Sequence, residues 1–309
     1  MIVTVTLNPA IDKTVDIGAF QYSGLNRITS VVLDPGGKGI NVSKTIKHLQ
    51  GDTLATGFLG GNGGKVIEQG LKNLGIESDF IYVDGETRTN MKVVDESGNV
   101  TEFNEQGPMI NEASIKELLN KIEEMADSDV LFVLAGSVPQ GVDKDIYRTI
   151  IETVKKKRAK VFLDADGELF VKALEAKPDY IKPNRFELEQ YFKFEGSANE
   201  DDLIVMGRKL QARGIGTVSI SLGKEGALFI LPKEVIKVPG LKVEAHSTVG
   251  AGDAMVAALS FGIDKGLSMD ECIRLCVATS AGAVTTIGTK PPTMDLVEAL
   301  KQEVKLIKR

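Results

Sequence analysis

The feature that most constrains the fold of this chain is a repeated alternation of amphipathic helical segments with continuously apolar segments of strand length. Residues 113–126, ASIKELLNKIEEMA, carry apolar residues at helical spacing, and residues 129–137, DVLFVLAGS, follow as an apolar run that closes on Gly136. The same pattern recurs at 144–158 with 159–165, at 168–176 with 179–183, and at 201–214 with 217–223. A first strand is expected at residues 2–7. Buried strands alternating with helices predict an α/β fold in three layers, with a mostly parallel central sheet covered on both faces.

Two regions lack this alternation. Residues about 13–34 and about 86–107 are typical of short strands joined by hairpin turns, with the second turn at residues 96–99. We expect them to form one small antiparallel sheet that acts as a lid. No linker or internal repeat interrupts the sequence, so residues 1–309 are expected to form a single domain that includes this lid. Because parallel sheets bind ligands beyond the carboxyl ends of their strands, functional residues should follow the strands closely.

Charge and composition exclude several classes of protein. The formal net charge is −6, so no overall positive field would gather nucleic acid or anionic lipid. The first residues, MIVTVTLNPA, contain no basic leader, and no apolar run approaches the roughly 18 residues of a membrane span. Cys272 and Cys276 lie in a predicted helix without a nearby histidine, which favours ordinary packing over metal binding. We therefore expect a cytoplasmic protein that binds neither nucleic acid nor membranes.

Glycine-rich segments suggest phosphate binding, but neither standard nucleotide motif is complete. GGNGGK, residues 60–65, lacks the leading glycine and the trailing Ser/Thr of a Walker A loop. Neither this segment nor GGKGIN, residues 36–41, has the glycine spacing of a dinucleotide-binding loop. Any phosphate site must therefore use a different construction.

STVGAGDAM, residues 247–255, places small residues and one carboxylate in front of a helical run. Gly250, Ala251 and Gly252 form the predicted turn into that helix, where unpaired backbone N–H groups and the positive end of the helix dipole suit an anion. Asp253 follows directly. Taken alone, this aspartate is equally well explained as a helix cap.

Two other segments enter predicted helices in a similar way. GGKGIN combines a glycine turn with a lysine and an asparagine, although a glycine-rich turn with a surface lysine would look the same. In KPNRFE, residues 182–187, Asn184 and Glu187 stand three apart, so both side chains can face one side. A capping interaction explains that spacing as well as metal chemistry does.

In this order, GGKGIN, AGS (135–137), KPNRFE, SLGKEGAL (221–228) and STVGAGDAM resemble the ribokinase/PfkB family of carbohydrate kinases over nearly the whole chain. TLNPAID (6–12), SGLNR (23–27), TRTNMKV (87–93) and TEFN (101–104) resemble its phosphosugar branch, particularly the bacterial 1-phosphofructokinases. The ribokinase-like fold of that family, a three-layer α/β/α domain with a β lid over the sugar, agrees with the fold predicted above.

The resemblance implies ATP and Mg²⁺ as cofactors and a role for each matching residue. Asp253 would be the base that takes the proton from the attacking sugar hydroxyl, beside an anion hole formed by Gly250, Ala251 and Gly252. Asn184 and Glu187 would position the metal, largely through water. The remaining nucleotide-side positions are Lys182, Ser221, Gly223 and Thr248, with the adenine pocket around residues 278–282.

The resemblance also implies an acceptor site. Its matching positions for the sugar hydroxyls are Asp12, Gly36, Gly37 and Asn41. A phosphate already on the sugar would need cations at the end away from Asp253, because a dianion must be neutralised there. The candidates are Arg27, Lys38 and Arg88, with Asn90 and Ser137 as neutral partners.

These expectations combine into an ATP-dependent kinase that converts fructose 1-phosphate to fructose 1,6-bisphosphate. Tagatose 6-phosphate and fructose 6-phosphate are alternative substrates for the same chemistry. A sugar or nucleotide sensor without turnover is an alternative from another class, although a pure binder would not need Asp253 and its glycine turn. We also expect the lids of two copies to pair in a homodimer, which would hide their edges and apolar faces.

Overall fold

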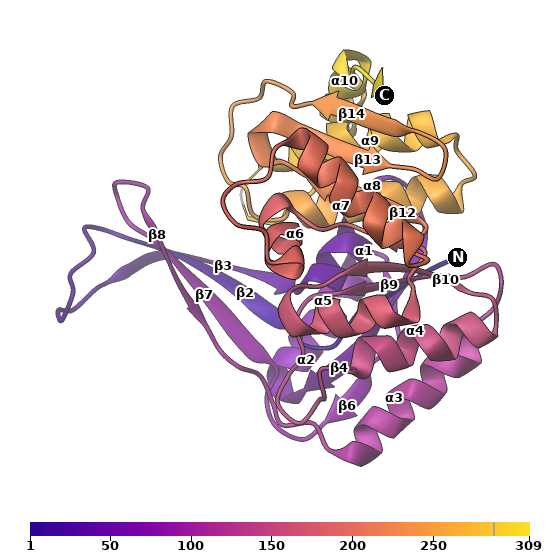
Figure 1. Cartoon of the computed structure of the whole chain (residues 1–309). Coiled ribbons are helices and arrows are strands. Elements are labelled where there is room, and N and C mark those ends of the chain that lie inside the picture. The colour runs from indigo at the N-terminus through magenta and orange to yellow at the C-terminus, as the bar shows by residue number, and fades with distance from the viewer. Residues whose placement is uncertain (287) are drawn as a thin grey trace.

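The computed structural model describes residues 1–286 and 288–309. A large sheet lies between helices on both faces, and a second, four-stranded sheet projects from this body as an arm (Figure 1). The described helices include none that is both long and apolar enough to cross a membrane.

The central sheet has 11 strands, and its middle is parallel, as the sequence predicts. Among the described strands of this sheet, the pairs at the C-terminal edge, from β12 onward, are antiparallel. The strand order is β15 (Ile307–Lys308), β14 (Val235–Pro239), β13 (Gly226–Ile230), β12 (Thr217–Ser221), β11 (Tyr180–Ile181), β10 (Lys160–Asp164), β9 (Leu131–Ala135), β1 (Ile2–Thr6), β4 (Thr53–Gly60) and β5 (Glu77–Ser78), with β6 (Ile81–Val83) also paired to β4.

Burial on both faces explains why the central strands are continuously apolar. Successive side chains of a strand point to opposite faces of the sheet. In β9, Phe132 and Leu134 therefore pack into one core cluster while Leu131 and Val133 pack into the other. The predicted three-layer α/β/α fold is confirmed.

Helices cover each face of the central sheet. One face packs against α3 (Glu112–Met125), α4 (Ile146–Lys156), α5 (Gly167–Ala173), α6 (Arg185–Phe192) and α7 (Glu200–Ala212), with the short η1 (Leu174–Ala176). The other packs against α1 (Lys38–His48), α8 (Ala251–Asp264), α9 (Met269–Ala283) and α10 (Met294–Glu303). Two elements remain: α2 (Gly61–Asn73) lies over a smaller cluster beside β4, and η2 (Gly223–Glu225) lies between β12 and β13.

The projecting sheet is formed by the two regions predicted as a lid, but it is not purely antiparallel. Its order is β3 (Ile28–Gly36), β2 (Ala10–Ile17), β7 (Arg88–Val94) and β8 (Val100–Asn104). The hairpins β2–β3 and β7–β8 are antiparallel, whereas β2 and β7 are parallel. The prediction of a purely antiparallel sheet was wrong because the chain leaves after β3, builds α1, β4 and α2, and re-enters in the direction of β2. The sheet also extends beyond the expected bounds, to Ala10 and Gly36.

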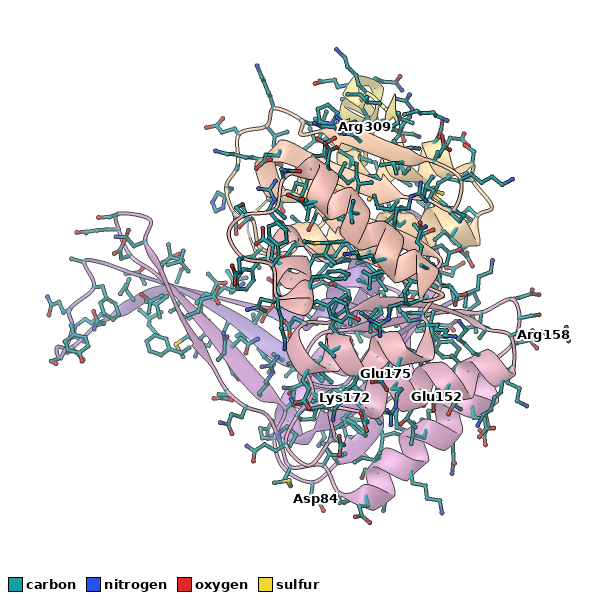
Figure 2. All side chains as sticks on the ribbon, viewed as in Figure 1. Asp84, Glu152, Arg158, Lys172, Glu175 and Arg309 are labelled. Atoms are coloured by element: carbon teal, nitrogen blue, oxygen red, sulfur yellow. The ribbon has the colours of Figure 1, made fainter. Side chains whose placement is uncertain are left out.

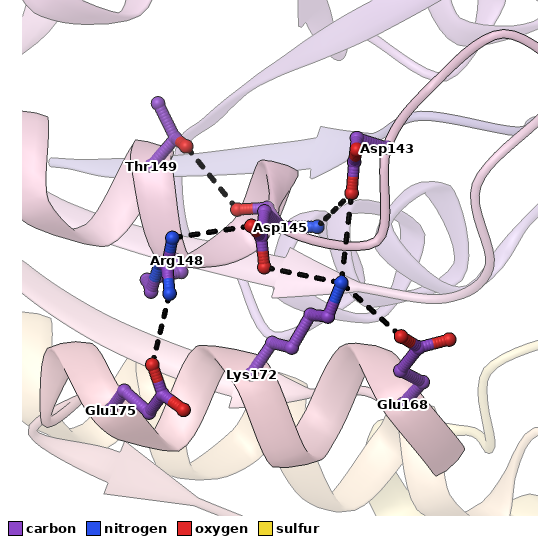
Figure 3. Close-up of polar contacts among 7 residues, drawn as sticks. All are labelled: Asp143, Asp145, Arg148, Thr149, Glu168, Lys172 and Glu175. Carbon is purple, nitrogen blue, oxygen red and sulfur yellow. Dashed lines mark hydrogen bonds and ion pairs between the residues drawn. The ribbon is translucent and has the colours of Figure 1, made fainter.

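Charged side chains cover the outer surface of the body, where Asp84 is exposed (Figure 2). One cluster joins the start of α4 to α5 (Figure 3). There Lys172 Nζ lies 3.7 Å from Asp143, 3.4 Å from Asp145 and 3.2 Å from Glu168. Exposed ion pairs of this kind contribute little to stability, since water already solvates both charges well.

Candidate active site

A cleft of about 740 Å³ lies beyond the carboxyl ends of β10, β11 and β12. The first turns of α1 and α8 line it from one side, and the lid strands β2, β7 and β8 contribute side chains from another. This location is the one expected for a ligand of an open α/β sheet. The cleft can therefore hold one ligand against the sheet and another under the lid.

The start of α8 forms the floor of the cleft. Gly250 has φ +83°, a left-handed conformation that favours glycine, and it caps the helix. A Cβ at Gly252 would lie 3.3 Å from Lys182 Nζ, so the small residue lets the ammonium approach the backbone closely. Ala251 lies between these glycines, so three successive small residues form the positive end of a 14-residue helix. This arrangement suits a bound or developing negative charge.

Asp253 lies in the first turn of α8, and its side chain is only 8% exposed. Asn41, from the first turns of α1, donates a hydrogen bond of 2.9 Å from Nδ2 to Asp253 Oδ2. Burial, followed by the nearby carboxylate of Asp164, raises the pKa of Asp253 to about 6, against lowering by Asn41 and by two lysines. A carboxylate with this pKa is largely ionised at neutral pH and can accept a proton from a ligand in the cleft.

Asp164 is a central residue of the site that the sequence analysis missed. It ends β10, is 2% exposed, and lies 3.3 Å from Lys182 Nζ and 3.9 Å from Lys38 Nζ. Both lysines face its Oδ1 atom as ion pairs, and none of the described residues makes a hydrogen bond of good geometry to that atom. The two lysines are therefore held beside Asp253 by a second buried carboxylate. The available signal was its position, since an aspartate directly after the apolar strand residues 161–163 must lie at the ligand-binding edge of a parallel sheet.

Lys38 lies at the Asp253 end of the cleft. The carboxylate of Asp164 raises the pKa of Lys38 most strongly, and Asp253 raises it further. From the sequence, Lys38 was a candidate partner for an anion at the far end from Asp253. Its observed neighbours instead favour an anion directly beside Asp253.

Under the lid, Asp12 of β2 and Asn90 of β7 face each other. Asn90 Nδ2 donates to Asp12 Oδ1 over 3.3 Å, and burial raises the pKa of Asp12. Gly36 lies behind this pair, where a Cβ would come within 2.4 Å of the carboxylate carbon of Asp12. Gly37 has φ +113° and lines the cleft at the start of α1. Carboxylate and amide groups at this spacing can hydrogen-bond a polyol.

Three residues predicted to bind the sugar phosphate differ in where they lie relative to the cleft. Arg88 lines the cleft, but its guanidinium donates to the backbone carbonyls of Asn8 and Glu105. Ser137 does not line the cleft, and its hydroxyl accepts a 3.4 Å hydrogen bond from Asn8 Nδ2. Arg27 is exposed in the loop between β2 and β3, at the far end of the lid and away from this cleft.

On the opposite side, Asn184 and Glu187 form a reciprocal cap at the start of α6. Asn184 Oδ1 accepts from the Glu187 backbone N–H, and Glu187 Oε2 accepts from the Asn184 backbone N–H, both at 2.9 Å. The capping interaction that this spacing allows is therefore formed. Both residues also line the cleft, and burial raises the pKa of Glu187. One carboxylate oxygen of Glu187 remains outside the cap, which fits a divalent cation that keeps most of its water.

The remaining predicted nucleotide-side residues also line the cleft, namely Lys182, Ser221, Gly223 and Thr248. Beyond them the wall becomes apolar, with side chains from the segment before α8 and from α9 and its C-terminal end. They include Leu241, Val243, Val277, Ala281 and Val284. The alternating segment LKVEA, residues 241–245, favours a strand, but the structure has no regular element there, and Leu241 and Val243 line the cleft instead.

Comparison with known proteins gives consistent matches over the full chain. The profile described as pfkB family carbohydrate kinase matches residues 5–295. The chain is 38% identical over 308 residues to the 1-phosphofructokinase of Bacillus subtilis, with 99% of each covered. It is 35% identical over 287 residues to the D-tagatose-1-phosphate kinase of Bacillus licheniformis, with 92% of each covered. The solved structure of phosphofructokinase-2 from Escherichia coli in complex with potassium has a TM-score of 0.93 at 30% identity and covers 98% of each chain.

Proposed function

This chain belongs to the pfkB family of carbohydrate kinases, and from that premise we propose that it transfers the γ-phosphate of ATP to fructose 1-phosphate. The products are fructose 1,6-bisphosphate and ADP. The observation that carries the proposal is the buried carboxylate of Asp253, held by Asn41 beside the glycine turn that begins α8. The similarity to the Bacillus subtilis 1-phosphofructokinase supports the choice of substrate.

In the proposed reaction, Asp253 accepts the proton of the C6 hydroxyl as that oxygen attacks the γ-phosphorus. The O–H bond of the sugar breaks, a new P–O bond forms, and the bond to the ADP oxygen breaks. Backbone N–H groups of Gly250, Ala251 and Gly252 stabilise the charge on the transferring group, a contribution that is often the largest in such sites. Lys38 and Lys182, held by Asp164, supply positive charge beside it.

We assign the nucleotide to the wall formed by the start of α6 and the apolar residues around α9. Leu241, Val243 and Val277 would contact the adenine ring. Asn184 and Glu187 would hold a divalent cation such as Mg²⁺ through water, and that cation would neutralise charge on the ATP phosphates when bound.

We assign the phosphosugar to the space under the lid. Asp12, Asn41 and Asn90 offer directional hydrogen bonds to its hydroxyls. Arg88 and Lys92 are the cations of the lid side of the cleft, so they are the proposed partners of the C1 phosphate. Lys92 was not among the residues predicted from the sequence.

We further propose a homodimer in which two lids pair. The outer part of the lid exposes large apolar side chains, including Leu25, Val31, Leu33 and Phe103. An apolar patch of this kind on a projecting sheet favours an interface. Arg27 lies outside the cleft of its own chain, so in this dimer it would be available to the sugar site of the second copy. Light scattering at micromolar concentration tests the dimer, and a monomeric protein would contradict it.

D-Tagatose 1-phosphate is a second candidate substrate, favoured by the similarity to the Bacillus licheniformis D-tagatose-1-phosphate kinase. It differs from fructose 1-phosphate only in the configuration of one ring hydroxyl, so the same anion clamp and base would serve both. Fructose 6-phosphate and tagatose 6-phosphate reverse the positions of phosphate and acceptor hydroxyl.

The test is a side-by-side measurement of ATP-dependent ADP release with all four phosphoketoses, using Asp253→Asn as the blank. We expect the highest kcat/KM with fructose 1-phosphate and a loss of roughly 10²- to 10⁴-fold in the variant, the usual contribution of a general base. A preference for tagatose 1-phosphate would change the substrate and keep the mechanism. Unchanged turnover in Asp253→Asn would contradict the mechanism, and no release with any sugar would contradict the kinase assignment.

A further inference from the structure

Lys44 is a buried lysine of α1 that none of the roles above uses. Its side chain is only 7% exposed, and it lies on the helix that places Val42 and Ile46 in the apolar core. Burial lowers the pKa of Lys44, with a smaller lowering by Lys290, whereas the more distant charges of Asp34, Asp12 and Asp253 act in the opposite direction. The described acceptors of its ammonium are all uncharged. Burying a cation is costly unless its donors are satisfied, so the contacts of this side chain are informative.

The ammonium of Lys44 has one acceptor for each of its three donors. Nζ lies 3.1 Å from the Pro35 carbonyl oxygen, 3.4 Å from Asn41 Oδ1 and 3.1 Å from Thr289 Oγ1. These acceptors belong to different parts of the site. Pro35 is in the lid strand β3, Asn41 is in α1, and Thr289 lies beside the glycine turn of α8, where a Cβ at Gly250 would be 3.4 Å from Thr289 Cγ2.

The contact with Asn41 determines which way its amide faces. An asparagine side chain carries an oxygen acceptor on one side and an NH₂ donor on the other. Lys44 has only donors, so it selects the orientation in which Oδ1 faces Lys44 and Nδ2 faces Asp253. The reverse orientation would place Oδ1 against the carboxylate and Nδ2 against the ammonium, which are two unfavourable contacts.

We propose that Lys44 is a positioning residue for the base, because its ammonium holds the Asn41 amide in the orientation that donates to Asp253. The proposal rests on the proposed function, in which Asp253 accepts the proton of the sugar. Lys44 does not touch the reacting atoms. It also links this hydrogen bond to the lid through Pro35 and to the glycine turn through Thr289.

The charges that surround Asp253 determine how its pKa responds to a change at Lys44. Asp164 at the end of β10 disfavours the ionised carboxylate, whereas Lys38 of α1 and Lys182 after β11 favour it. Lys44 also lies close enough to interact with Asp253. Replacing Lys44 with an uncharged residue removes one favourable charge and releases the Asn41 amide, and both changes favour protonated Asp253.

The direct test titrates Asp253 in the substrate-free protein by NMR of carboxyl-labelled aspartate. The resonance of Asp253 is the one that disappears in Asp253→Asn. In Lys44→Met we expect its pKa to rise by about half a unit or more, which is a threefold or greater change in proton affinity. In Lys44→Arg, which retains the charge and the donors, the pKa of Asp253 should stay close to its value in the original protein. Lys172→Met, a surface lysine outside the cleft, is the matched control and should leave the titration unchanged.

A titration in Lys44→Met that matches the original protein would overturn the proposal. If Lys44→Met does not fold, Lys44→Gln replaces it: glutamine has no charge and offers an acceptor as well as donors, so it no longer selects one orientation of Asn41, and the pKa of Asp253 should again rise. Because the titration needs no substrate, it gives an answer even if the proposed sugar is wrong.

A double-mutant cycle separates positioning from a general loss of stability. With the phosphoketose that the enzyme turns over, Lys44→Met should lower kcat by about tenfold and change KM little. In an Asn41→Ala background, the same substitution should cost about threefold or less, because Asn41 transmits the effect. Equal losses in both backgrounds would show that Lys44 does not act through Asn41.

Discussion

Asp253→Asn should make the protein more stable at pH 7 while it abolishes most of the activity. In the folded state the pKa of Asp253 is raised from 3.8 to about 6, chiefly by burial. The folded state therefore binds a proton more tightly than the unfolded state does, and ionised Asp253 destabilises the fold above pH 6. One pKa unit corresponds to about 1.4 kcal/mol, so the shift sets a penalty of about 3 kcal/mol at pH 7.

Asparagine has nearly the same shape but no charge, and its oxygen can still accept the hydrogen bond from Asn41. The variant therefore escapes the penalty without leaving a cavity. Because the penalty develops only as the unfolded aspartate ionises, the difference between the two proteins should fall from about 3 kcal/mol at pH 7 to about 1 kcal/mol at pH 4.5. This pH dependence distinguishes the effect from a simple improvement in packing.

Urea unfolding at pH 4.5, 5.5 and 7 measures the difference directly. The matched control is Asp84→Asn, because Asp84 is exposed on the body (Figure 2) and does not line the cleft. That control should not change the free energy of unfolding by more than about 0.5 kcal/mol at any of these pH values. A variant at Asp253 that is less stable at pH 7, or a difference that does not depend on pH, would refute the reasoning.

Three further predictions concern the same cleft. With a pKa of about 6 for Asp253, kcat/KM should fall by about tenfold between pH 7 and pH 5, because the ionised fraction of Asp253 falls by that factor. The residual activity of Asp253→Asn should lack this fall and should change with pH only through titration of the sugar phosphate. Asp164→Asn removes the like charge that raises the pKa of Asp253, so the acid limb of kcat/KM should move to lower pH; a shift in the opposite direction would contradict this account. Gly36→Ala places a Cβ within 2.4 Å of the Asp12 carboxylate carbon and should raise KM for the sugar by about tenfold or more, whereas Gly18→Ala, whose nearest neighbour would be 4.0 Å away, should have the original KM.

Much of the fold could be predicted because it depends on local patterns. Apolar runs of strand length between amphipathic helices have few stable arrangements other than a covered parallel sheet. The direction of β7 relative to β2 could not be predicted in this way. It depends on the route of the chain through α1, β4 and α2, which no local turn signal records.

The candidate site was predictable where a residue and its backbone lie in one short segment. The glycine turn before Asp253 and the cap formed by Asn184 and Glu187 are of this kind. Asp164 was within reach of the same reasoning, since it directly follows a buried strand. The role of Lys44 could not be predicted in this way, because the sequence does not distinguish it from the exposed lysines of other helices.

By itself, the sequence determined the three-layer architecture, the order of its elements and the position of the glycine turn at the start of α8. The tertiary structure alone decided that Asn41 lies 2.9 Å from Asp253, although they are 212 positions apart. It likewise decided the pKa of Asp253, the grouping of Lys38 with Asp164, and the burial of Lys44. The physical reason is that periodicity and turn chemistry act over a few neighbouring residues, whereas desolvation and charge interactions depend on which distant segments packing brings together.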